Sequence, residues 1–311
     1  MSGLRSLLLA GIVTAVVHGA AAAEPAPRLT YVSLNVLHGG MFSGLRGNGQ
    51  ELERRLEMIT AELRALAPDV VGLQEASVGR DRGHVARRLA EALGFRWVYS
   101  PALVGMLPFA WMTRLASMAM NFEEGPAILS RFPIVAWEAH PLPRCNGAFD
   151  PRVLVRATLD TRWGPLTVGS THTSRGFCEA ARVRELITAH RGPLPVVLMG
   201  DFNAGPDSAP IRTLTEEAGL VDVFHAVNPA ERGPTVWQHV FGPSPTVRRR
   251  VDFIFMLPGT KVPGRVVSSR LVVNTPGRLP DGRPLWPSDH YGVLAEIELR
   301  PAGATTATGV T

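Results

Sequence analysis

A carboxylate and a carboxamide lie two residues apart directly after an apolar run of the chain. Asp201 and Asn203 follow residues 194–198, which read Leu-Pro-Val-Val-Leu. Because side chains alternate along a strand, we expect both polar side chains on one face where this strand ends. A carboxylate can accept a proton from water, and an amide can donate hydrogen bonds to a bound anion. Sites of α/β proteins are often built at such strand ends, so this pair is the first candidate for a site.

Polar side chains also follow strand-like segments at four other places in the chain. One such fragment would carry little weight, but five in one chain indicate a single shared site. The four places are Asn35, Gln74 with Glu75, His172, and Asp289 with His290.

Among these residues, Glu75 is the best candidate for a metal ligand. Mg²⁺ prefers oxygen ligands and is typically held by one or two carboxylates, several waters and substrate phosphate. Residues 70–73 before Glu75 are apolar, so a buried strand end is favoured over a solvated surface glutamate. Asn35 offers a neutral oxygen for the same site, although an asparagine that begins a turn is a serious alternative.

A second kind of chemistry that these residues could perform is the activation of a water molecule. Asp201 and His290 are suited to accept or orient the proton of that water. Asp252 lies within the apolar run 251–255, where a carboxylate without a partner would be costly to bury. An ion pair with Arg249 or Arg250 is one explanation for its presence there.

Taken in order along the chain, these fragments resemble the endonuclease/exonuclease/phosphatase superfamily, which includes DNase I-like nucleases, neutral sphingomyelinases and inositol-polyphosphate phosphatases. The resemblance covers about residues 29–299 and depends on the ordered set, because each short fragment alone is a weak signal. It implies an α/β (α+β) fold in which two packed mixed β-sheets flanked by helices form a four-layer sandwich. It also implies hydrolysis of a phosphate ester with a divalent metal, usually Mg²⁺, with Mn²⁺ as the alternative. The fragments are residues 34–36, 74–75, 125–130, 171–172, 200–203, 251–254 and 288–291.

The resemblance further implies roles for individual residues. Asp252 would support His290 by bonding its other ring nitrogen, which fixes the tautomer and favours the imidazolium. His172 and Asn203 would contact the phosphoryl oxygens, whose charge grows in the transition state.

Three further positions, Asp289, Glu124 and Leu37, can be compared with the superfamily. Asp289 resembles a position near the metal, but Ser288 and Asp289 are equally typical of a turn with local backbone bonding. Glu124 resembles an acidic residue that orients His172 in some relatives. Leu37 stands where nucleases of abasic sites often carry a carboxylate, and those relatives are intracellular, so DNA repair is set aside.

Apolar periodicity predicts the elements that position these residues. Hairpins occur together with strand-helix-strand units, which indicates packed sheets with helices outside. Strands are predicted at 29–36, 70–74, 95–99, 127–130, 134–139, 152–160, 166–171, 196–200, 251–256, 266–273 and 292–299, and helices at 50–66, 85–93, 179–190 and 209–218.

The first 23 residues are predicted to be a secretory signal peptide. Arg5 precedes the apolar stretch 7–17 and the alanine run 20–23, and the stretch is well short of the roughly 20 residues that span a membrane. The mature chain would then contain one endonuclease/exonuclease/phosphatase domain, residues 24–300, and a tail, residues 301–311, that is expected to be disordered. The protein would be secreted or periplasmic.

Cys145 and Cys178 are predicted to form a disulfide. They lie on either side of the turn 161–165, and pairing of the strands that flank this turn brings both cysteines to one end. Two free thiols are the alternative, because the flanking loops are irregular.

The substrate class stays open between nucleic acid and a phospholipid headgroup. The net charge of +5 is compatible with a phosphodiester but does not by itself imply nucleic acid. The apolar insertion 101–122 would favour contact with a membrane surface and a sphingomyelin-like diester, and a lid folded onto its own domain is an equal alternative. The run Arg248, Arg249 and Arg250 would hold phosphates or form a solvated face.

The favoured function is therefore a metal-dependent phosphodiesterase. A phosphomonoesterase for inositol phosphates or small metabolites is the enzymatic alternative. A catalytically silent, toxin-like or adhesion module is the alternative of another class, and it would not need this set of polar residues. No obligate protein partner is inferred.

Overall fold

The computed structural model describes residues 26–38, 50–80, 82–103, 115, 121–145, 151–174 and 177–299. The predicted signal peptide, most of the apolar insertion 101–122 and the predicted tail 301–311 lie outside the described residues. In the part of the chain that is described, no helix combines the length and the apolar character needed to cross a membrane.

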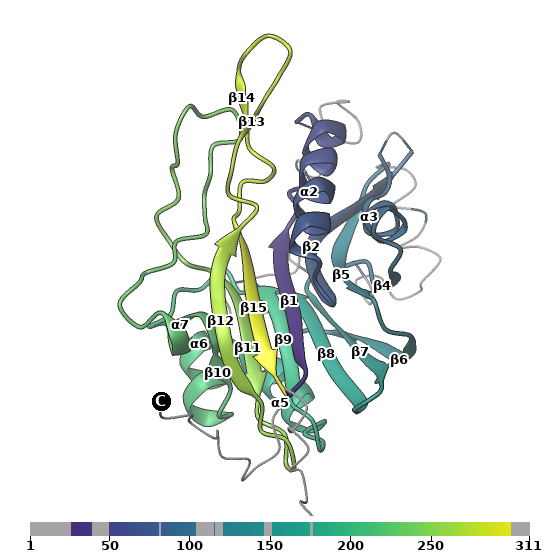
Figure 1. The fold of residues 1–311 in the computed structure, drawn as a ribbon, viewed down its shortest axis with the longest axis vertical. Coiled ribbons are helices and arrows are strands. Elements are labelled where there is room, and N and C mark those ends of the chain that lie inside the picture. The colour runs from purple at the N-terminus through teal and green to yellow at the C-terminus, as the bar shows by residue number, and fades with distance from the viewer. Residues whose placement is uncertain are drawn as a thin grey trace, which may run out of the picture.

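Two mixed β-sheets pack face to face (Figure 1). Each sheet contains one parallel pair near its centre, β1 with β2 and β8 with β9, among antiparallel neighbours. The first sheet has the order β12 (Arg265–Val272), β15 (Gly292–Glu298), β1 (Arg28–Asn35), β2 (Val70–Gly79), β5 (Glu123–Ser130) and β4 (Arg96–Tyr99), with β3 (Gly83–His84) paired to β2. The second has the order β10 (Val221–Asp222), β11 (Asp252–Leu257), β9 (Val196–Asp201), β8 (Gly164–His172), β7 (Val153–Thr161) and β6 (Ile134–Pro141).

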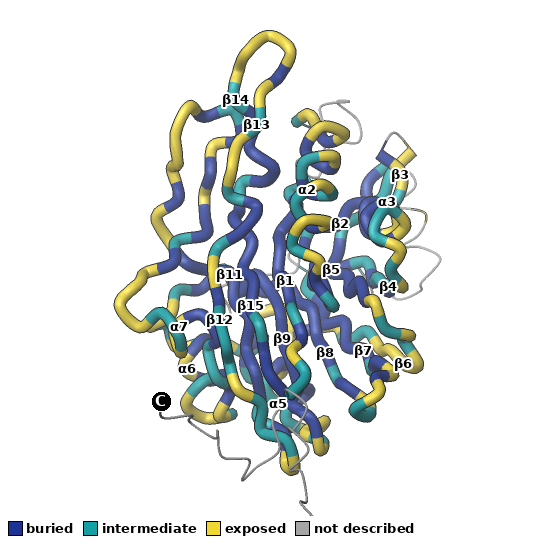
Figure 2. The backbone as a smooth tube through the Cα atoms, viewed as in Figure 1, coloured by how far each residue is buried: buried dark blue, intermediate teal, exposed yellow. Residues whose placement is uncertain are grey.

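Helices cover the outer faces of both sheets, which confirms the predicted four-layer sandwich. Figure 2 shows that the buried positions follow the strands between these layers. The sheets approach closely at Gly72 of β2, where a Cβ atom would lie 2.7 Å from the Cβ atom of Met199. The first sheet carries α2 (Leu52–Leu66) and α3 (Val85–Leu93), and the second carries α5 (Phe177–Thr188) and α6 (Ala209–Arg212).

Helix α2 shows why periodicity predicted these elements well. Its apolar positions Leu52, Leu56, Ile59 and Leu63 are all buried against the first sheet. Helix α3 spans the predicted residues and ends at Gly94, whose φ of 70° is the left-handed conformation that glycine adopts most easily.

Several short elements depart from the prediction. The helix expected at 209–218 is instead the short α6 followed by a π-helical turn, Thr213–Glu217. The two-residue strand β10, helix α7 (Val223–Val227) and the small hairpin of β13 (Gly277–Arg278) with β14 (Pro284–Leu285) were not predicted. These segments are shorter than the window over which a hydrophobic period can be detected.

The predicted disulfide between Cys145 and Cys178 is confirmed. Strands β7 and β8 pair as a hairpin in which Thr161 lies opposite Gly164. Cys145 lies in the segment before β7, and Cys178 lies in the first turn of α5, which follows β8. The Cα atoms are 6.0 Å apart, within the range that a disulfide spans.

Candidate active site

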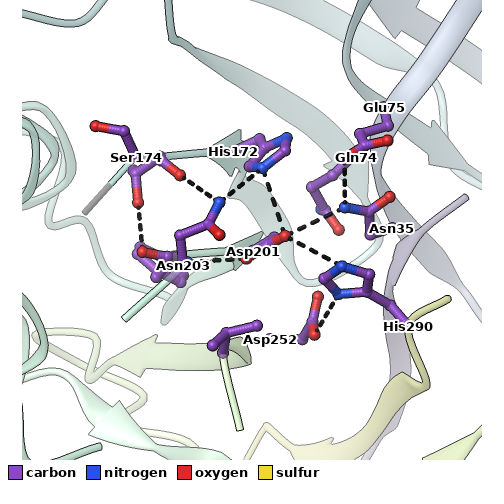
Figure 3. A network of polar contacts seen from close by, with 12 residues as sticks. Asn35, Gln74, Glu75, His172, Ser174, Asp201, Asn203, Asp252 and His290 are labelled. Carbon is purple, nitrogen blue, oxygen red and sulfur yellow. Dashed lines mark hydrogen bonds and ion pairs between the residues drawn. The ribbon is translucent and has the colours of Figure 1, made fainter. Parts of the chain in front are cut away.

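The register of the strands brings the predicted polar residues to one edge of the sandwich (Figure 3). Parallel pairing aligns Asn35 with Gln74 in the first sheet and His172 with Asp201 in the second. Strand β11 then places Asp252 opposite Asp201. Both sheets therefore contribute side chains to a single site.

Asn35 joins the two sheets at this edge. Its Nδ2 donates to Oε1 of Glu75 at 3.1 Å and to Oδ2 of Asp201 at 3.2 Å. Its Oδ1 accepts the N–H of Leu37 at 3.0 Å, the local bond of an asparagine turn. The amide therefore faces the two carboxylates with its nitrogen and positions them, and coordination of a metal by its oxygen stays a prediction.

Glu75 reaches the site through an irregularity of β2. Strict alternation would send its side chain to the face opposite Gln74, whose Nε2 donates to Oγ of Ser170 at 3.2 Å between the sheets. The pairing with β5 shifts between Leu73 and Ala76, and Glu75 itself has a left-handed φ of 56°. This bulge turns its carboxylate toward Asn35. Such strained backbone is common at functional sites.

The surroundings of Glu75 favour its ionised form. Burial raises the pKa of the carboxyl, but the charges of His38 and His290 and the bond from Asn35 outweigh burial and lower the pKa to about 2. His38, which the sequence had not indicated, donates its backbone N–H to Oε2 at 3.1 Å and holds its Nε2 3.2 Å from the same oxygen. Glu75 is therefore a carboxylate at neutral pH.

A buried chain of two carboxylates and one imidazole faces Glu75. His290 Nδ1 lies 2.9 Å from Oδ2 of Asp252, and His290 Nε2 lies 3.7 Å from Oδ2 of Asp201. Burial lowers the pKa of His290, but the two carboxylates outweigh it and raise this pKa well above its ordinary value. Burial and the charge of Asp252 raise the pKa of Asp201 to about 7, although His290 and two hydrogen bonds oppose the shift. The site therefore holds an imidazolium next to a carboxyl that titrates near neutrality.

The arginine alternative for Asp252 is wrong. Arg250 forms a two-pronged ion pair with Asp222 instead, at 3.0 and 2.7 Å. Arg249 is exposed, and its Nη2 lies 3.5 Å from the carbonyl oxygen of Asn203. The partner that makes burial of Asp252 tolerable is His290.

Asn203 and His172 form the remaining side of the site. Asn203 has a left-handed φ of 50°, and its backbone N–H donates to Oδ1 of Asp201 at 2.8 Å. Its Nδ2 donates to the carbonyl oxygen of Thr173 at 2.9 Å and lies 3.0 Å from Nε2 of His172. Nε2 of His172 also lies 3.4 Å from Oδ2 of Asp201, so this ring nitrogen faces both the amide and a carboxylate.

His172 is not oriented by Glu124. Its Nδ1 is buried and has no hydrogen-bond partner among the described residues, so the predicted contact from this glutamate is not formed. Burial and the charge of Arg152 hold the pKa of His172 well below its ordinary value. The ring is therefore neutral, which is compatible with hydrogen bonding to an anion but not with a permanent positive charge.

Asp289 lies beside the carboxylates but forms few contacts of its own. Its Oδ1 is 3.5 Å from Oγ of Ser288, and its carbonyl oxygen accepts the N–H of Gln238 at 2.7 Å. Burial raises the pKa of its carboxyl, and the negative charge of Glu75 adds to that shift. The role of Asp289 as a metal ligand beside Glu75 stays a prediction.

Arg55 holds the backbone next to the site residues in place, and it was not predicted from the sequence. This fully buried side chain of α2 donates to the carbonyl oxygens of Val36 at 2.9 Å, Leu37 at 3.0 Å and Pro287 at 3.2 Å. Val36 and Leu37 directly follow Asn35, and Pro287 directly precedes Ser288. One guanidinium therefore connects two segments of the site. A charged residue within the apolar stripe of a helix was the signal that could have identified it.

The sandwich and its polar edge define the class of DNase I-like α/β proteins. The model of the Endonuclease/Exonuclease/phosphatase family matches residues 32–290, and the chain belongs to this family of metal-dependent phosphoester hydrolases. A comparison with curated protein sequences found no match.

Solved structures share the fold at low sequence identity. A mannosyl-6-phosphatase of Bacteroides thetaiotaomicron is 20% identical, with coverage of 86% of this chain and 99% of that chain and a TM-score of 0.65. The catalytic domain of human Nocturnin with bound sulfate is 18% identical, with coverage of 88% and 96% and a TM-score of 0.63. A family protein of Beutenbergia cavernae is 22% identical, with coverage of 88% and 72% and a TM-score of 0.61.

Proposed function

We propose that this protein is a secreted or periplasmic phosphodiesterase that depends on Mg²⁺, with Mn²⁺ as the alternative cation. The observation that carries this proposal is the pair of carboxylates joined by Asn35. Glu75 has a pKa lowered to about 2, whereas Asp201 has a pKa raised to about 7. One carboxylate is therefore suited to hold a cation, and the other is suited to accept a proton.

The donor set fits a divalent cation at Glu75. Glu75 would be the principal ligand, and Asn35 and Asp289 would add oxygens to it once the Asn35 amide, which now turns its nitrogen to Glu75, presents its oxygen. When bound there, the cation would neutralise charge on the phosphoryl oxygens and stabilise the transition state. Asp201, Asp252 and His290 also place one ligand atom each within 4.8 Å of one another. A proton on the His290 ring competes with a cation in that second group, so we favour Glu75.

Asp201 would remove the proton from the attacking water. The N–H of Asn203 and the amide of Asn35 hold its two oxygens in place. The imidazolium of His290, fixed by Asp252, would stabilise negative charge on Asp201 or on the departing oxygen. His172 and Asn203 would exchange their mutual contact for contacts with phosphoryl oxygens.

Two classes of ester are compatible with this site. A phosphodiester of nucleic acid or of a phospholipid headgroup is favoured, and the bound sulfate in the Nocturnin domain supports a site for a tetrahedral anion. The mannosyl-6-phosphatase among the similar structures is the specific observation that favours the phosphomonoesterase alternative. The membrane contact proposed for residues 101–122 rests on the sequence alone.

A parallel activity screen tests the proposal. The mature protein would be assayed on DNA, RNA, sphingomyelin vesicles, inositol phosphates and mannose 6-phosphate, with Mg²⁺, Mn²⁺ or chelator. Hydrolysis of a diester that requires the cation is the expected result. Turnover of monoesters alone would replace this proposal by the alternative, and no turnover of any ester would favour the binding module.

A further inference from the structure

Trp237 is an exposed tryptophan at the rim of the site, and the proposed hydrolysis does not use it. Its residue is 56% exposed, although Val236 and Gln238 on either side are buried. The indole therefore points toward solvent while the side chains of both neighbours point into the protein. A single exposed apolar residue is ordinary by itself, so the argument depends on where Trp237 lies relative to the candidate site.

Backbone pairing fixes this tryptophan next to the site. Val236 pairs with His290 on one side and with Arg249 on the other. The N–H of Gln238 donates to the carbonyl oxygen of Asp289 at 2.7 Å. The segment that carries Trp237 is therefore tied directly to two residues of the candidate site, so the position of the indole relative to a bound phosphate is fixed by the fold.

Arg249 connects the indole with the phosphate site. Its Cζ lies 5.8 Å from the centroid of the Trp237 ring, and its Nη2 lies 3.5 Å from the carbonyl oxygen of Asn203. Asn203 in turn contacts His172. A positive, planar group thus spans the distance between the proposed phosphate contacts and the exposed ring. We call Trp237 and Arg249 together the aromatic ledge.

The chemistry of the aromatic ledge restricts what it can bind. A flat ring stacks well on an indole, and bases of single strands use such platforms without sequence preference. A quaternary ammonium also binds indoles, but the guanidinium of Arg249 already lies beside the ring and would repel a second cation. The same guanidinium attracts an adjacent phosphate. A ligand with a neutral flat ring next to a phosphodiester satisfies all three conditions.

We propose that the aromatic ledge is a subsite for a nucleobase and that the ester cut at the site belongs to single-stranded nucleic acid. This inference rests on the proposed function, because it names the substrate of the same site. An unpaired base is required, since bases within a duplex are already stacked on their neighbours. A choline headgroup and a sugar phosphate are the competing ligands for the indole.

Oligonucleotide binding to the full mature chain tests the aromatic ledge without turnover. A fluorescein-labelled oligothymidylate would be titrated in chelator and followed by anisotropy, for the wild type, Trp237→Phe and Trp237→Ala. We expect Trp237→Ala to raise Kd at least about fivefold and Trp237→Phe to raise it less, because one stacked base is lost or weakened. The same strand with abasic spacers at every position should bind all three proteins equally.

Trp137→Ala is the matched control, because Trp137 is also exposed, at 48%, but lies on the edge strand β6. It should bind the oligonucleotide as the wild type does.

In the assay with Mg²⁺, Trp237→Ala should raise KM for the thymine strand and leave kcat within about twofold. Unchanged Kd in Trp237→Ala, or equal weakening with the spacer strand, would overturn the inference. Weakened binding of sphingomyelin vesicles or mannose 6-phosphate, with no effect on the oligonucleotide, would overturn it as well. Absence of hydrolysis by the wild type would instead remove the proposed function. The anisotropy result would still decide whether the aromatic ledge binds a nucleobase.

Discussion

His290 Nδ1 lies 2.9 Å from Oδ2 of Asp252, and both side chains are buried. This contact fixes the ring so that its other nitrogen faces Asp201 at 3.7 Å. The carboxylate of Asp252 lies within an apolar strand, where it would be costly without a partner of opposite charge. The pair therefore explains both the burial of an acid and the protonation of a histidine.

Replacing Asp252 by Asn should lower the pKa of His290. The carboxylate is the main group that raises this pKa against the effect of burial, so its removal favours the neutral ring. Two-dimensional NMR of the imidazole nitrogens in metal-free protein would show that the variant loses the second ring proton at a lower pH than the wild type does. We also expect hydrolysis to fall by roughly 10²-fold.

The same pair should make stability depend on pH in a defined direction. The pKa of His290 is raised on folding, so its stabilising contribution is complete below the unfolded value near 6.5 and is lost as the pH rises through the folded pKa. In urea unfolding, the difference between wild type and Asp252→Asn should therefore shrink toward alkaline pH. A His290 ring that stays protonated in the variant would contradict the pairing.

Glu75→Gln should remove the response to Mg²⁺. The amide keeps the size of the side chain but loses the negative charge that the cation needs, so we expect a loss of roughly 10²-fold or more in cation-dependent hydrolysis. Isothermal titration with Mn²⁺ would report binding separately from turnover. Glu296→Gln is the control and should leave both measurements unchanged. Glu296 accepts a hydrogen bond from Ser268 on the neighbouring strand and is far from Glu75 in sequence. Tight Mn²⁺ binding in Glu75→Gln would show that the cation lies elsewhere.

Arg55→Met should destabilise the fold and disturb the site together. The substitution removes the donor of two buried and one part-buried hydrogen bonds to carbonyl oxygens, and we expect the free energy of unfolding to fall by about 3 kcal/mol or more. Arg55→Lys should recover part of this loss. Arg131→Met is the control, because Arg131 also donates to backbone carbonyls but has an exposed side chain, and it should cost less than about 1 kcal/mol.

Mn²⁺ affinity separates a positioning role of Arg55 from a purely structural one. Arg55→Lys should bind Mn²⁺ more weakly than wild type at a temperature where both proteins are fully folded. Equal affinity in that variant would mean that the arginine stabilises the fold without positioning the site.

Loss of the disulfide should lower the melting temperature. The bond between Cys145 and Cys178 closes a loop with a sequence separation of 33, which is worth about 2–4 kcal/mol in the unfolded-chain model. Replacing both cysteines by Ser, or adding reductant, should lower Tm by roughly 5–10 °C in circular dichroism. A melting curve that reductant leaves unchanged would count against a stabilising bond.

Most of the fold could be predicted because each strand is a short apolar run with clear ends. The apolar stripe of α2 and the run before Asp201 identify their elements without tertiary information. The polar residues at strand ends could also be predicted to share one site, because the ends of neighbouring parallel strands meet. The short hairpin of β13 and β14 has no such pattern, since each strand contains only two residues.

The geometry within the site could not be predicted from periodicity. The bulge at Glu75 reverses the face on which alternation would place the side chain. The choice of His290 over an arginine as the partner of Asp252 depends on the register of β11 with β9, which only the assembled sheet determines. Arg55 donates to backbone carbonyls, and because every residue has one, no residue type in the sequence identifies its partners.

The central claim is that Asp201 accepts a proton beside a cation held by Glu75. Its most direct test is the rate of cleavage of a soluble phosphodiester by wild type and Asp201→Asn, each with Mg²⁺ and with chelator. The account predicts cation-dependent cleavage by the wild type and a loss of roughly 10²-fold or more in a folded Asp201→Asn protein. Cleavage that persists in chelator, or full activity of Asp201→Asn, would contradict it.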